Sequence, residues 1–248
     1  MKKKKHYLIL FFLTFTLLIV SCSPYDIRKD GVYYIEWNTG QGRVERKISN
    51  ADKNTFKHIK GRYGKDKNFV FFKRKIIEGA DPNTFERLKR GYSIDKYRAY
   101  YYGDSITNSS CKKFEIINNY YSRDYRNIYY QNQALNVCSV ENFEFVFHDS
   151  IENSFRRWTR DGCNYFINNV KVPSSEYDKL IVYPKSGGIS SDSKYVYHFD
   201  RNIYYNSKGV RVLDTIDINT FEVYGFIKCR DKYGKINLYN EKKQIRMK

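Results

Sequence analysis

Aromatic and polar positions alternate along most of the chain in short runs, and these runs recur with a fixed period. Phenylalanine recurs every 29 residues, at Phe56, Phe85, Phe114 and Phe143. An aspartate follows each of the first three by ten residues, at Asp66, Asp95 and Asp124, and the same interval separates Phe221 from Asp231. A constant period indicates a repeat protein in which each unit is one small group of secondary-structure elements.

Each repeat is predicted to contain short strands separated by two polar turns. The first turn reads Ala51-Asp52-Lys53-Asn54-Thr55 in one repeat and Ala80-Asp81-Pro82-Asn83-Thr84 in the next. Asp and Asn side chains bond the backbone two residues on, and Pro fixes φ, so the chain turns here. The second turn lies at the recurring aspartate. Aromatic runs typical of strands follow it, at residues 69–72, 97–102, 128–130, 195–199 and 203–205.

The second turn carries a recurring signature. Asp66-Lys67-Asn68-Phe69, Asp95-Lys96-Tyr97 and Asp231-Lys232-Tyr233, with paired aromatics such as Tyr129-Tyr130, resemble the DKNYY family of bacterial repeat proteins. The resemblance covers most of residues 30–240, is stretched between Phe143 and Asp161, and is blurred by a Gly-Gly and serine-rich loop at residues 184–193. The resemblance implies a repeat architecture. It brings no activity and no catalytic residues with it.

The period predicts an all-β fold made of stacked repeats. A unit of about 29 residues holds three or four short antiparallel strands or hairpins, which cannot bury both faces of their aromatic side chains alone. Linear stacking would give a solenoid-like or twisted sheet array, and radial stacking would give a small β-propeller. Propeller blades usually have about 40 residues, so the period favours the linear array and leaves the propeller as the alternative.

The N-terminus reads as a secretory signal. Lys2 to Lys5 form a positive segment, and an apolar run of 14 residues follows from Tyr7 to Val20. A membrane-spanning helix needs about 20 apolar residues. The run is therefore expected to be the apolar region of a signal peptide.

The end of this run resembles the lipobox of bacterial lipoproteins. Ile19, Val20 and Ser21 lead into Cys22. The resemblance implies cleavage before Cys22 and acylation of its thiol, and two or more acyl chains anchor a protein stably. We therefore expect a signal peptide at residues 1–21, a short tether at 22–30 and one DKNYY-like β-repeat domain at 31–248. Ser23, where sorting rules would place Asp for retention, implies the outer membrane or cell surface if the host has two membranes.

The chain is strongly basic. It carries 45 Lys and Arg residues against 27 acidic residues, and removal of the four signal lysines leaves a charge of +14. In an envelope setting such a surface attracts anionic lipid headgroups or glycans, and we expect no nucleic acid partner. The lysines are scattered, however, and a solvated surface explains them as simply.

Cysteine usage agrees with export. Besides Cys22, four cysteines remain, an even number in an oxidising compartment: Cys111, Cys138, Cys163 and Cys229. Two disulfides in any of three pairings are possible. No pair has CxxC spacing and His is scarce, so a metal or redox site is not predicted.

Candidate sites are few. The aromatic rows could stack on sugar rings, but a repetitive core explains them more simply. The recurring aspartates lack the alternating oxygen ligands of a calcium loop, so turn capping is favoured.

His148-Asp149-Ser150 is contiguous, and neighbouring strand residues point to opposite faces, which argues against a catalytic triad. Glu141 and Glu144 with Asp149 are acids that nothing distinguishes as a hydrolase pair.

These patterns predict no cofactor, no metal and no catalytic residue. The predicted function is a membrane-anchored, non-enzymatic lipoprotein that binds an envelope protein or anionic glycan, or that has a structural role in the envelope. The alternative is an envelope glycan-binding module or glycan hydrolase. The only functional site residue that the sequence assigns is Cys22, as the lipidated residue.

Overall fold

The computed structural model describes residues 23–147, 158–203, 205–207, 210–212 and 216–238. Strands make up nearly all of its regular structure, and two 3₁₀ turns, η1 (Tyr177–Lys179) and η2 (Ile218–Thr220), interrupt them. In these ranges no helix combines the length and the apolarity that a membrane crossing requires. The expected all-β fold class is confirmed.

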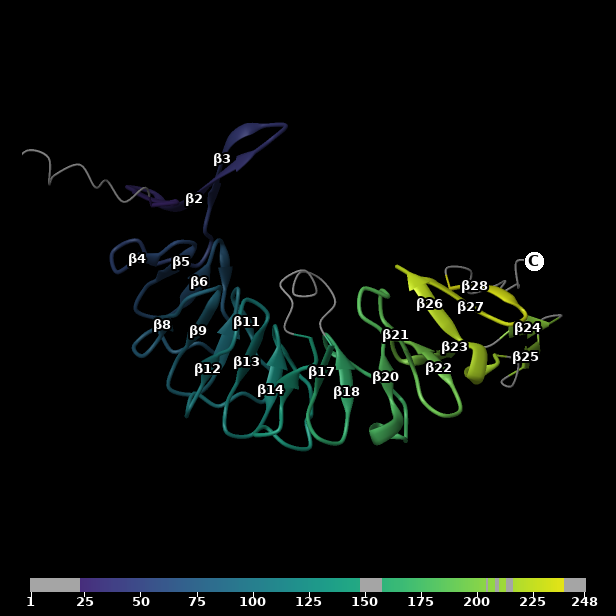
Figure 1. Cartoon of the computed structure of the whole chain (residues 1–248). Helices are drawn as coiled ribbons and strands as arrows, with labels where there is room; N and C mark the ends of the chain where they lie inside the picture. Colours follow the sequence, from purple (N-terminus) through teal and green to yellow (C-terminus); the bar gives the residue numbers. More distant parts are fainter. Residues whose placement is uncertain (1–22, 148–157, 204, 208–209, 213–215, 239–248) are drawn as a thin grey trace, which may run out of the picture. The chain divides into compact units, whose positions relative to one another are not determined.

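Short antiparallel sheets follow one another along the chain, and each is built from consecutive strands (Figure 1). The first sheet has three strands, β1 (Tyr25–Arg28), β2 (Gly31–Asn38) and β3 (Gly42–Lys47). Of the range 22–30 that was expected to be a tether, residues 25–28 thus form a strand paired with β2. No described sheet closes into a barrel.

Five four-stranded sheets follow. Their strands are β4 (Lys57–Lys60), β5 (Tyr63–Lys65), β6 (Val70–Phe72), β7 (Lys75–Ile76); β8 (Glu86–Arg87), β9 (Tyr92–Ile94), β10 (Ala99–Tyr101), β11 (Asp104–Ser105); β12 (Glu115–Ile116), β13 (Tyr121–Arg123), β14 (Ile128–Tyr130), β15 (Gln133–Ala134); β16 (Glu144–Phe145), β17 (Trp158–Arg160), β18 (Tyr165–Ile167), β19 (Val170–Lys171); and β20 (Ile181–Val182), β21 (Ile189–Ser191), β22 (Val196–His198), β23 (Arg201–Ile203). We number these sheets repeats 1 to 5.

Two further sheets complete the described chain. One is a two-stranded sheet of β24 (Tyr205–Ser207) and β25 (Val210–Val212). The other, repeat 6, contains β26 (Glu222–Gly225), β27 (Lys228–Asp231) and β28 (Gly234–Asn237). The 29-residue period is preserved in the strands themselves, because β5, β9 and β13 begin at Tyr63, Tyr92 and Tyr121. The predicted repeat of short antiparallel strands is confirmed.

Residue contacts divide the chain into two compact units. The first contains the chain up to Lys96 together with Tyr102–Asp104, and the second contains Tyr97–Tyr101 and the chain from Ser105 onward. Within each unit, side chains of neighbouring repeats share a core. In the first unit Val32 and Tyr34 of β2 pack with Phe56 and Phe71 of repeat 1.

The second unit has the same construction. Tyr121 and Ile128 of repeat 3 pack with Phe166 of repeat 4, and further clusters join repeats 4 and 5 and repeats 5 and 6. Across both units, the largest fully buried side chains of the described residues are Tyr92, Tyr100, Tyr121 and Tyr129. Most of the aromatic pattern is thus explained by packing between repeats, where tyrosine and phenylalanine bury large apolar areas.

A compact residue lies two positions before the recurring aspartate in every repeat. The residues at this position are Gly64, Ser93, Ser122, Thr159, Ser190 and Cys229. In repeat 1 the reason is steric, because a Cβ on Gly64 would lie 2.4 Å from Cζ of Phe56. Phe56 therefore needs a neighbour without a Cβ on the adjacent strand.

We expect Gly64→Ala to destabilise the protein by about 1–3 kcal/mol, because the added methyl group overpacks a buried aromatic contact. Ser122→Ala is the matched comparison, since the buried Ser122 hydroxyl has no hydrogen-bond partner. Its removal should leave stability within about 0.5 kcal/mol of wild type or raise it. Chemical denaturation of both variants measures the difference, and equal stabilities would contradict the steric explanation.

Candidate binding site

The aspartates that the repeat singles out are buried in the turns after the second strands. We call them the turn aspartates: Asp66, Asp95, Asp124, Asp161, Asp192 and Asp231, all at most 6 % exposed. In repeat 1, Oδ1 of Asp66 accepts the N–H groups of Asn68 and Phe69, both at 2.7 Å. Its Oδ2 accepts the N–H of Asp52 at 2.9 Å, 14 residues earlier. One carboxylate therefore ties two turns together.

Repeat 3 uses the same geometry. Oδ2 of Asp124 accepts the N–H of Ser110 at 2.7 Å and the hydroxyl of Tyr129 at 2.8 Å. Its Oδ1 accepts the N–H groups of Arg126 and Asn127. Burial and the adjacent carboxylate raise the pKa of Tyr129, so its hydroxyl stays protonated and donates.

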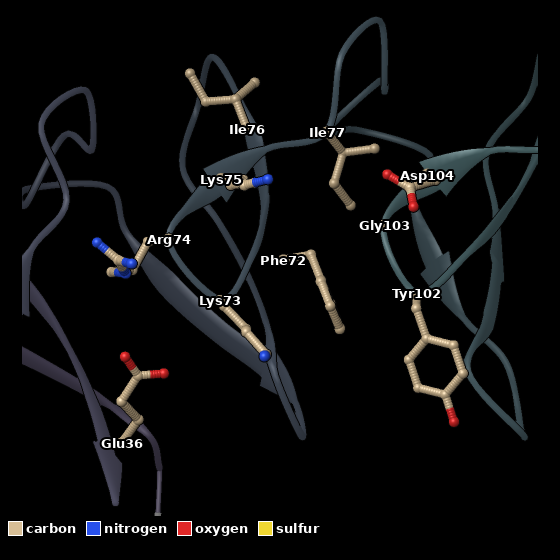
Figure 2. Close-up of a pocket in the computed structure, with 10 residues that line it drawn as sticks. All are labelled: Glu36, Phe72, Lys73, Arg74, Lys75, Ile76, Ile77, Tyr102, Gly103 and Asp104. Atoms are coloured by element: carbon tan, nitrogen blue, oxygen red, sulfur yellow. The ribbon is translucent and has the colours of Figure 1, made fainter. Parts of the chain in front are cut away.

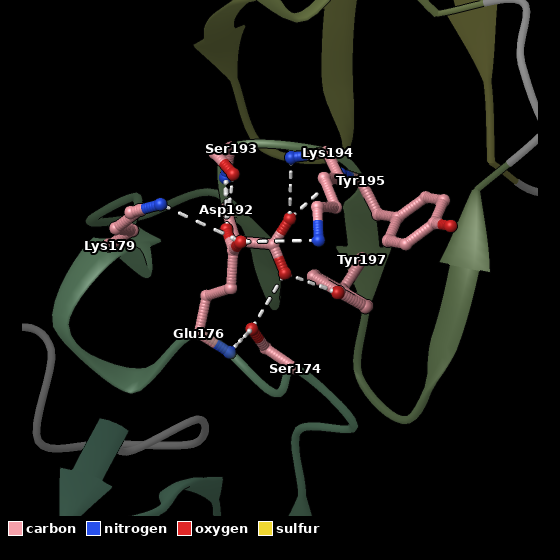
Figure 3. A network of polar contacts seen from close by, with 8 residues as sticks. All are labelled: Ser174, Glu176, Lys179, Asp192, Ser193, Lys194, Tyr195 and Tyr197. Atoms are coloured by element: carbon pink, nitrogen blue, oxygen red, sulfur yellow. Dashed lines mark hydrogen bonds and ion pairs between the residues drawn. The ribbon is translucent and has the colours of Figure 1, made fainter.

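Figure 3 shows the version in repeat 5, where hydroxyl groups replace part of the backbone set. Ser174 donates its hydroxyl to Oδ2 of Asp192 at 2.6 Å, and Tyr197 donates to the same oxygen at 2.5 Å. The N–H groups of Lys194 and Tyr195 donate to Oδ1, each at 2.8 Å. Burial raises the pKa of Asp192, but these donors outweigh it and hold the pKa below its usual range.

A second set of polar contacts, nearer the surface, also links the two turns of a repeat. In repeat 2, Asp81 accepts the Thr84 hydroxyl at 3.0 Å and pairs with Lys96 at 2.9 Å, while the N–H of Lys96 donates to the Thr84 hydroxyl at 3.1 Å. We call this set the Asp–Thr–Lys clasp. It recurs as Asp52, Thr55 and Lys67. In repeat 6 Lys232 pairs with Asp217 and its N–H donates to the Thr220 hydroxyl, but that hydroxyl donates to the backbone carbonyl oxygen of Asp217.

The clasps make the fold sensitive to acid. The Lys96 ammonium lowers the pKa of Asp81, and Lys232 does the same for Asp217. In the first clasp the pKa of Asp52 is lowered mainly by the N–H of Asn54. A carboxyl with a depressed pKa contributes stability above its unfolded value near 4, and this contribution is lost as the pH falls through the folded value.

Repeat 4 replaces the clasp with a disulfide between Cys138 and Cys163. The N–H of Cys138 donates to Oδ2 of Asp161 at 2.8 Å, as the N–H of Asp52 donates to Oδ2 of Asp66 in repeat 1. The two sulfurs and the Asp161 carboxylate lie close together, but both sulfurs are committed to the bridge and offer no thiolate ligand.

The other two cysteines form no disulfide. Cys229 is fully buried at the compact-residue position of repeat 6, where burial raises the pKa of its thiol to about 12 and keeps it unreactive. Cys111 is partly buried. Of the pairings left open by the sequence, the structure contains Cys138 with Cys163. Cys22, the predicted lipidation residue, lies outside the described residues.

The histidines and isolated acids are in ordinary contacts. Nε2 of His58 lies 2.9 Å from the carbonyl oxygen of Gly61, and Nε2 of His198 lies 3.3 Å from that of Gly187. Glu144 pairs with Arg160 at 2.5 Å, and Glu141 accepts the Ser139 hydroxyl at 3.4 Å. His148, Asp149 and Ser150 lie outside the described residues.

A pocket that the sequence did not predict lies in the first unit. It has a volume of about 340 Å³, and its lining comes from β2, from the hairpin of β6 and β7, and from the turn that leads into β11. Figure 2 shows the lining side chains. They are Glu36, Phe72, Lys73, Arg74, Lys75, Ile76, Ile77, Tyr102, Gly103 and Asp104.

Hairpin geometry presents the cations of this pocket. Lys73 adopts the left-handed conformation at φ 55°, as do the corresponding residues Tyr102 and Gln131 of the next two repeats. A residue in this conformation is typical of the first position of a two-residue hairpin turn. Lys73 and Arg74 therefore form the turn between β6 and β7, and Lys75 is the first residue of β7. Within the described residues none of the three forms an ion pair.

Aromatic and acidic groups complete the pocket. The rings of Phe72 and Tyr102 meet edge to face with centroids 6.1 Å apart. Gly103 allows this approach, because a Cβ there would lie 2.6 Å from Cβ of Phe72. Glu36 already pairs with Arg46 at 3.7 Å, and Asp104 is exposed. We call this site the basic pocket. Its sequence signal is the run of three cations directly after Phe71-Phe72.

Comparison with known proteins identifies the repeat. The sequence model of the DKNYY family matches residues 25–170. The chain belongs to the DKNYY family. No curated protein and no solved structure matches it.

The DKNYY pattern continues in the structure beyond the matched residues. Repeats 5 and 6 each hold a turn aspartate, Asp192 and Asp231, and repeat 6 also has the Lys232–Asp217 ion pair and the bond from the Lys232 N–H to Thr220. In the DKNYY signature the aspartate is the buried acceptor. The lysine that follows it belongs to the clasp, and the aromatics belong mainly to the core between repeats.

We expect Asp124→Ala to destabilise the protein by about 3 kcal/mol, because it leaves buried N–H and O–H donors without an acceptor. Asp124→Asn should cost less, since its oxygen can still accept the N–H groups of Arg126 and Asn127. Asp104→Asn, an exposed control, should stay within about 0.5 kcal/mol of wild type. Urea denaturation gives the three values, and a neutral Asp124→Ala would contradict the structural role.

Proposed function

We propose that the chain is a lipid-anchored protein of the bacterial cell envelope that acts by binding an anionic partner rather than by catalysis. The anchor is supported by the basic segment, the apolar run and Cys22, which together resemble a lipoprotein signal. A disulfide between Cys138 and Cys163 is in keeping with an oxidising compartment.

A binding role agrees with the contacts of the recurring polar residues. The oxygens of the turn aspartates accept hydrogen bonds from N–H and O–H donors, so these recurring residues stabilise the fold. The described histidines contact backbone carbonyl oxygens. The basic pocket, in contrast, holds three cations that form no ion pair within the described residues.

The observation that carries the proposal is the cationic hairpin of that pocket. Three consecutive cations lie beside two aromatic rings and are not neutralised by carboxylates in the described part of the chain. Positive charge concentrated at a concave site raises the local concentration of anions and speeds their association. An anionic envelope glycan or an acidic surface of an envelope protein has the matching charge.

Intact mass spectrometry of the membrane fraction tests the anchor. The native protein should have the mass of residues 22–248 plus acyl chains, and Cys22→Ala should carry no acyl mass, because the thiol that accepts the lipid is gone. Ser21→Thr is a matched control that retains the thiol. A native protein without acyl mass would overturn the anchoring proposal.

Binding to a labelled hexagalacturonate tests the pocket. We expect Arg74→Gln/Lys75→Gln to weaken binding about tenfold, while Lys112→Gln/Lys171→Gln, which removes the same charge elsewhere, keeps it. Binding should also weaken from low to high salt, because the cations are exposed. Equal affinities for the two double variants, or affinity independent of salt, would overturn the assignment.

A glycan-binding or glycan-hydrolysing function is the second candidate. The rings of Phe72 and Tyr102 favour sugar stacking, and Glu36 and Asp104 are acids of the same pocket. Binding of neutral maltohexaose that is lost in Tyr102→Asn, or release of shortened products from envelope glycans, would support it. Asn is chosen because it tolerates the left-handed backbone of Tyr102.

A further inference from the structure

The hairpin of β2 and β3 exposes a large aromatic side chain to solvent. Trp37 is 80 % exposed, more than any other large hydrophobic side chain in the described residues. Arg43 lies directly opposite it in the register of the hairpin, and its side chain is 52 % exposed. Directly opposed residues project from the same face of a sheet. An aromatic ring and a cation therefore stand side by side.

The same face continues toward the base of the hairpin. Tyr33 and Ile35 alternate with buried residues and lie opposite Lys47 and Glu45. We call Tyr33, Ile35, Trp37, Arg43 and Lys47 the hairpin face.

The cations on and beside this face are ion-paired. The guanidinium of Arg28 lies 4.4 Å from the centroid of the Tyr33 ring and pairs with Asp26 at 2.8 Å and Glu45 at 2.5 Å. Arg43 also pairs with Glu45, at 2.9 Å, and Lys47 pairs with Asp30 at 3.4 Å. Three cations thus meet three carboxylates, and the face is polar at its base without a net charge.

The residue next to Trp37 has a different environment. Glu36 lines the basic pocket, and successive strand residues point to opposite sides. The hairpin face therefore looks away from the pocket, so the exposure of Trp37 is not explained by that site.

Chain length ties the hairpin face to the proposed anchor. The carbonyl oxygen of Pro24 accepts the N–H of Ile35 at 2.7 Å, and Tyr25 is already buried in the core. Cys22 precedes Pro24 by two residues in the sequence, and two residues of chain span at most about 7 Å. Trp37 follows Ile35 by two residues on β2, so the Cα atoms of these two residues are ~7 Å apart. A lipid on Cys22 would leave the protein next to the exposed tryptophan.

We propose that the hairpin face lies in the headgroup layer of the membrane that holds the acyl chains, with Trp37 at the boundary with the hydrocarbon. The proposal rests on the proposed anchoring at Cys22. Tryptophan favours this layer because its ring is apolar and its N–H can still donate, and the ion-paired side chains beside it are compatible with the polar headgroups.

Trp37 fluorescence provides the test. The full-length protein holds two tryptophans, and Trp158 is 3 % exposed, so quenching by acrylamide reports mainly Trp37. The purified protein is reconstituted into phosphatidylcholine vesicles with and without phosphatidylglycerol. Acrylamide quenching should fall roughly threefold relative to protein in solution, and brominated lipids should quench the emission, because the ring enters the interface. The protection should appear in both kinds of vesicle, because the ion-paired cations leave the hairpin face without a net charge.

A matched variant locates the effect. Trp37→Ser/Ile181→Trp moves the exposed reporter to another strand position whose native side chain is 57 % exposed. Brominated lipids should not quench this variant. Quenching equal to wild type would overturn the proposal.

Intact mass measured on the same samples separates this proposal from the anchor. Acylated protein whose Trp37 stays as accessible to acrylamide in vesicles as in solution would overturn the hairpin face alone. Protein without acyl mass whose Trp37 is still quenched by brominated lipids would refute the anchor and retain the hairpin face. Protection of Trp37 in vesicle-free solution, with a doubled mass by light scattering, would assign the face to a second copy and overturn the membrane proposal.

Discussion

A carboxylate taken out of water is tolerated in a protein only when donors surround its oxygens, and this requirement organises the whole molecule. Each turn aspartate is nearly inaccessible and is positioned to accept backbone N–H groups, with hydroxyl donors added in repeats 3 and 5. One oxygen fixes the turn that contains the aspartate, and the other fixes a turn that precedes it in the chain. The same carboxylate therefore holds the local turn and closes the repeat. Strands of two or three residues can form because hydrogen bonds to this carboxylate hold both of their ends.

Packing between repeats depends on this closure. Strands this short have little stability alone, so their aromatic side chains must be covered by the next repeat. The turn aspartates set where each strand begins, and the buried tyrosines of neighbouring repeats then occupy equivalent positions at an interval of 29 residues. In repeat 1 the absence of a side chain at Gly64 makes room for Phe56, so side-chain volume there agrees with the backbone register.

Sequence reasoning captured the features that depend on local chemistry. The period, the two turns, the strands after Asp66, Asp95 and Asp124, and the capping role of these residues all follow from residue types at fixed intervals. It did not reveal that Asp66 also bonds Asp52, because an acceptor with a partner 14 residues away leaves no local signal. For the same reason the sequence left the pairing of Cys138 with Cys163 open and did not reveal the burial of Cys229 or the basic pocket, since each depends on strands brought together by the fold.

In repeat 4 a disulfide takes the place of the ion pair, and this replacement affects how a repeat can accept added residues during evolution. The two bonded turn positions are 14 residues apart in repeats 1 to 3 and 23 apart in repeat 4. This added length between two bonded positions costs only about 0.4 kcal/mol of closure entropy, which is less than a covalent link typically returns, about 3 kcal/mol. The strands on either side of the added residues, β16 and β17, keep their antiparallel pairing. Individual repeats can therefore acquire new loops independently, and a uniform scaffold can vary its surface one segment at a time.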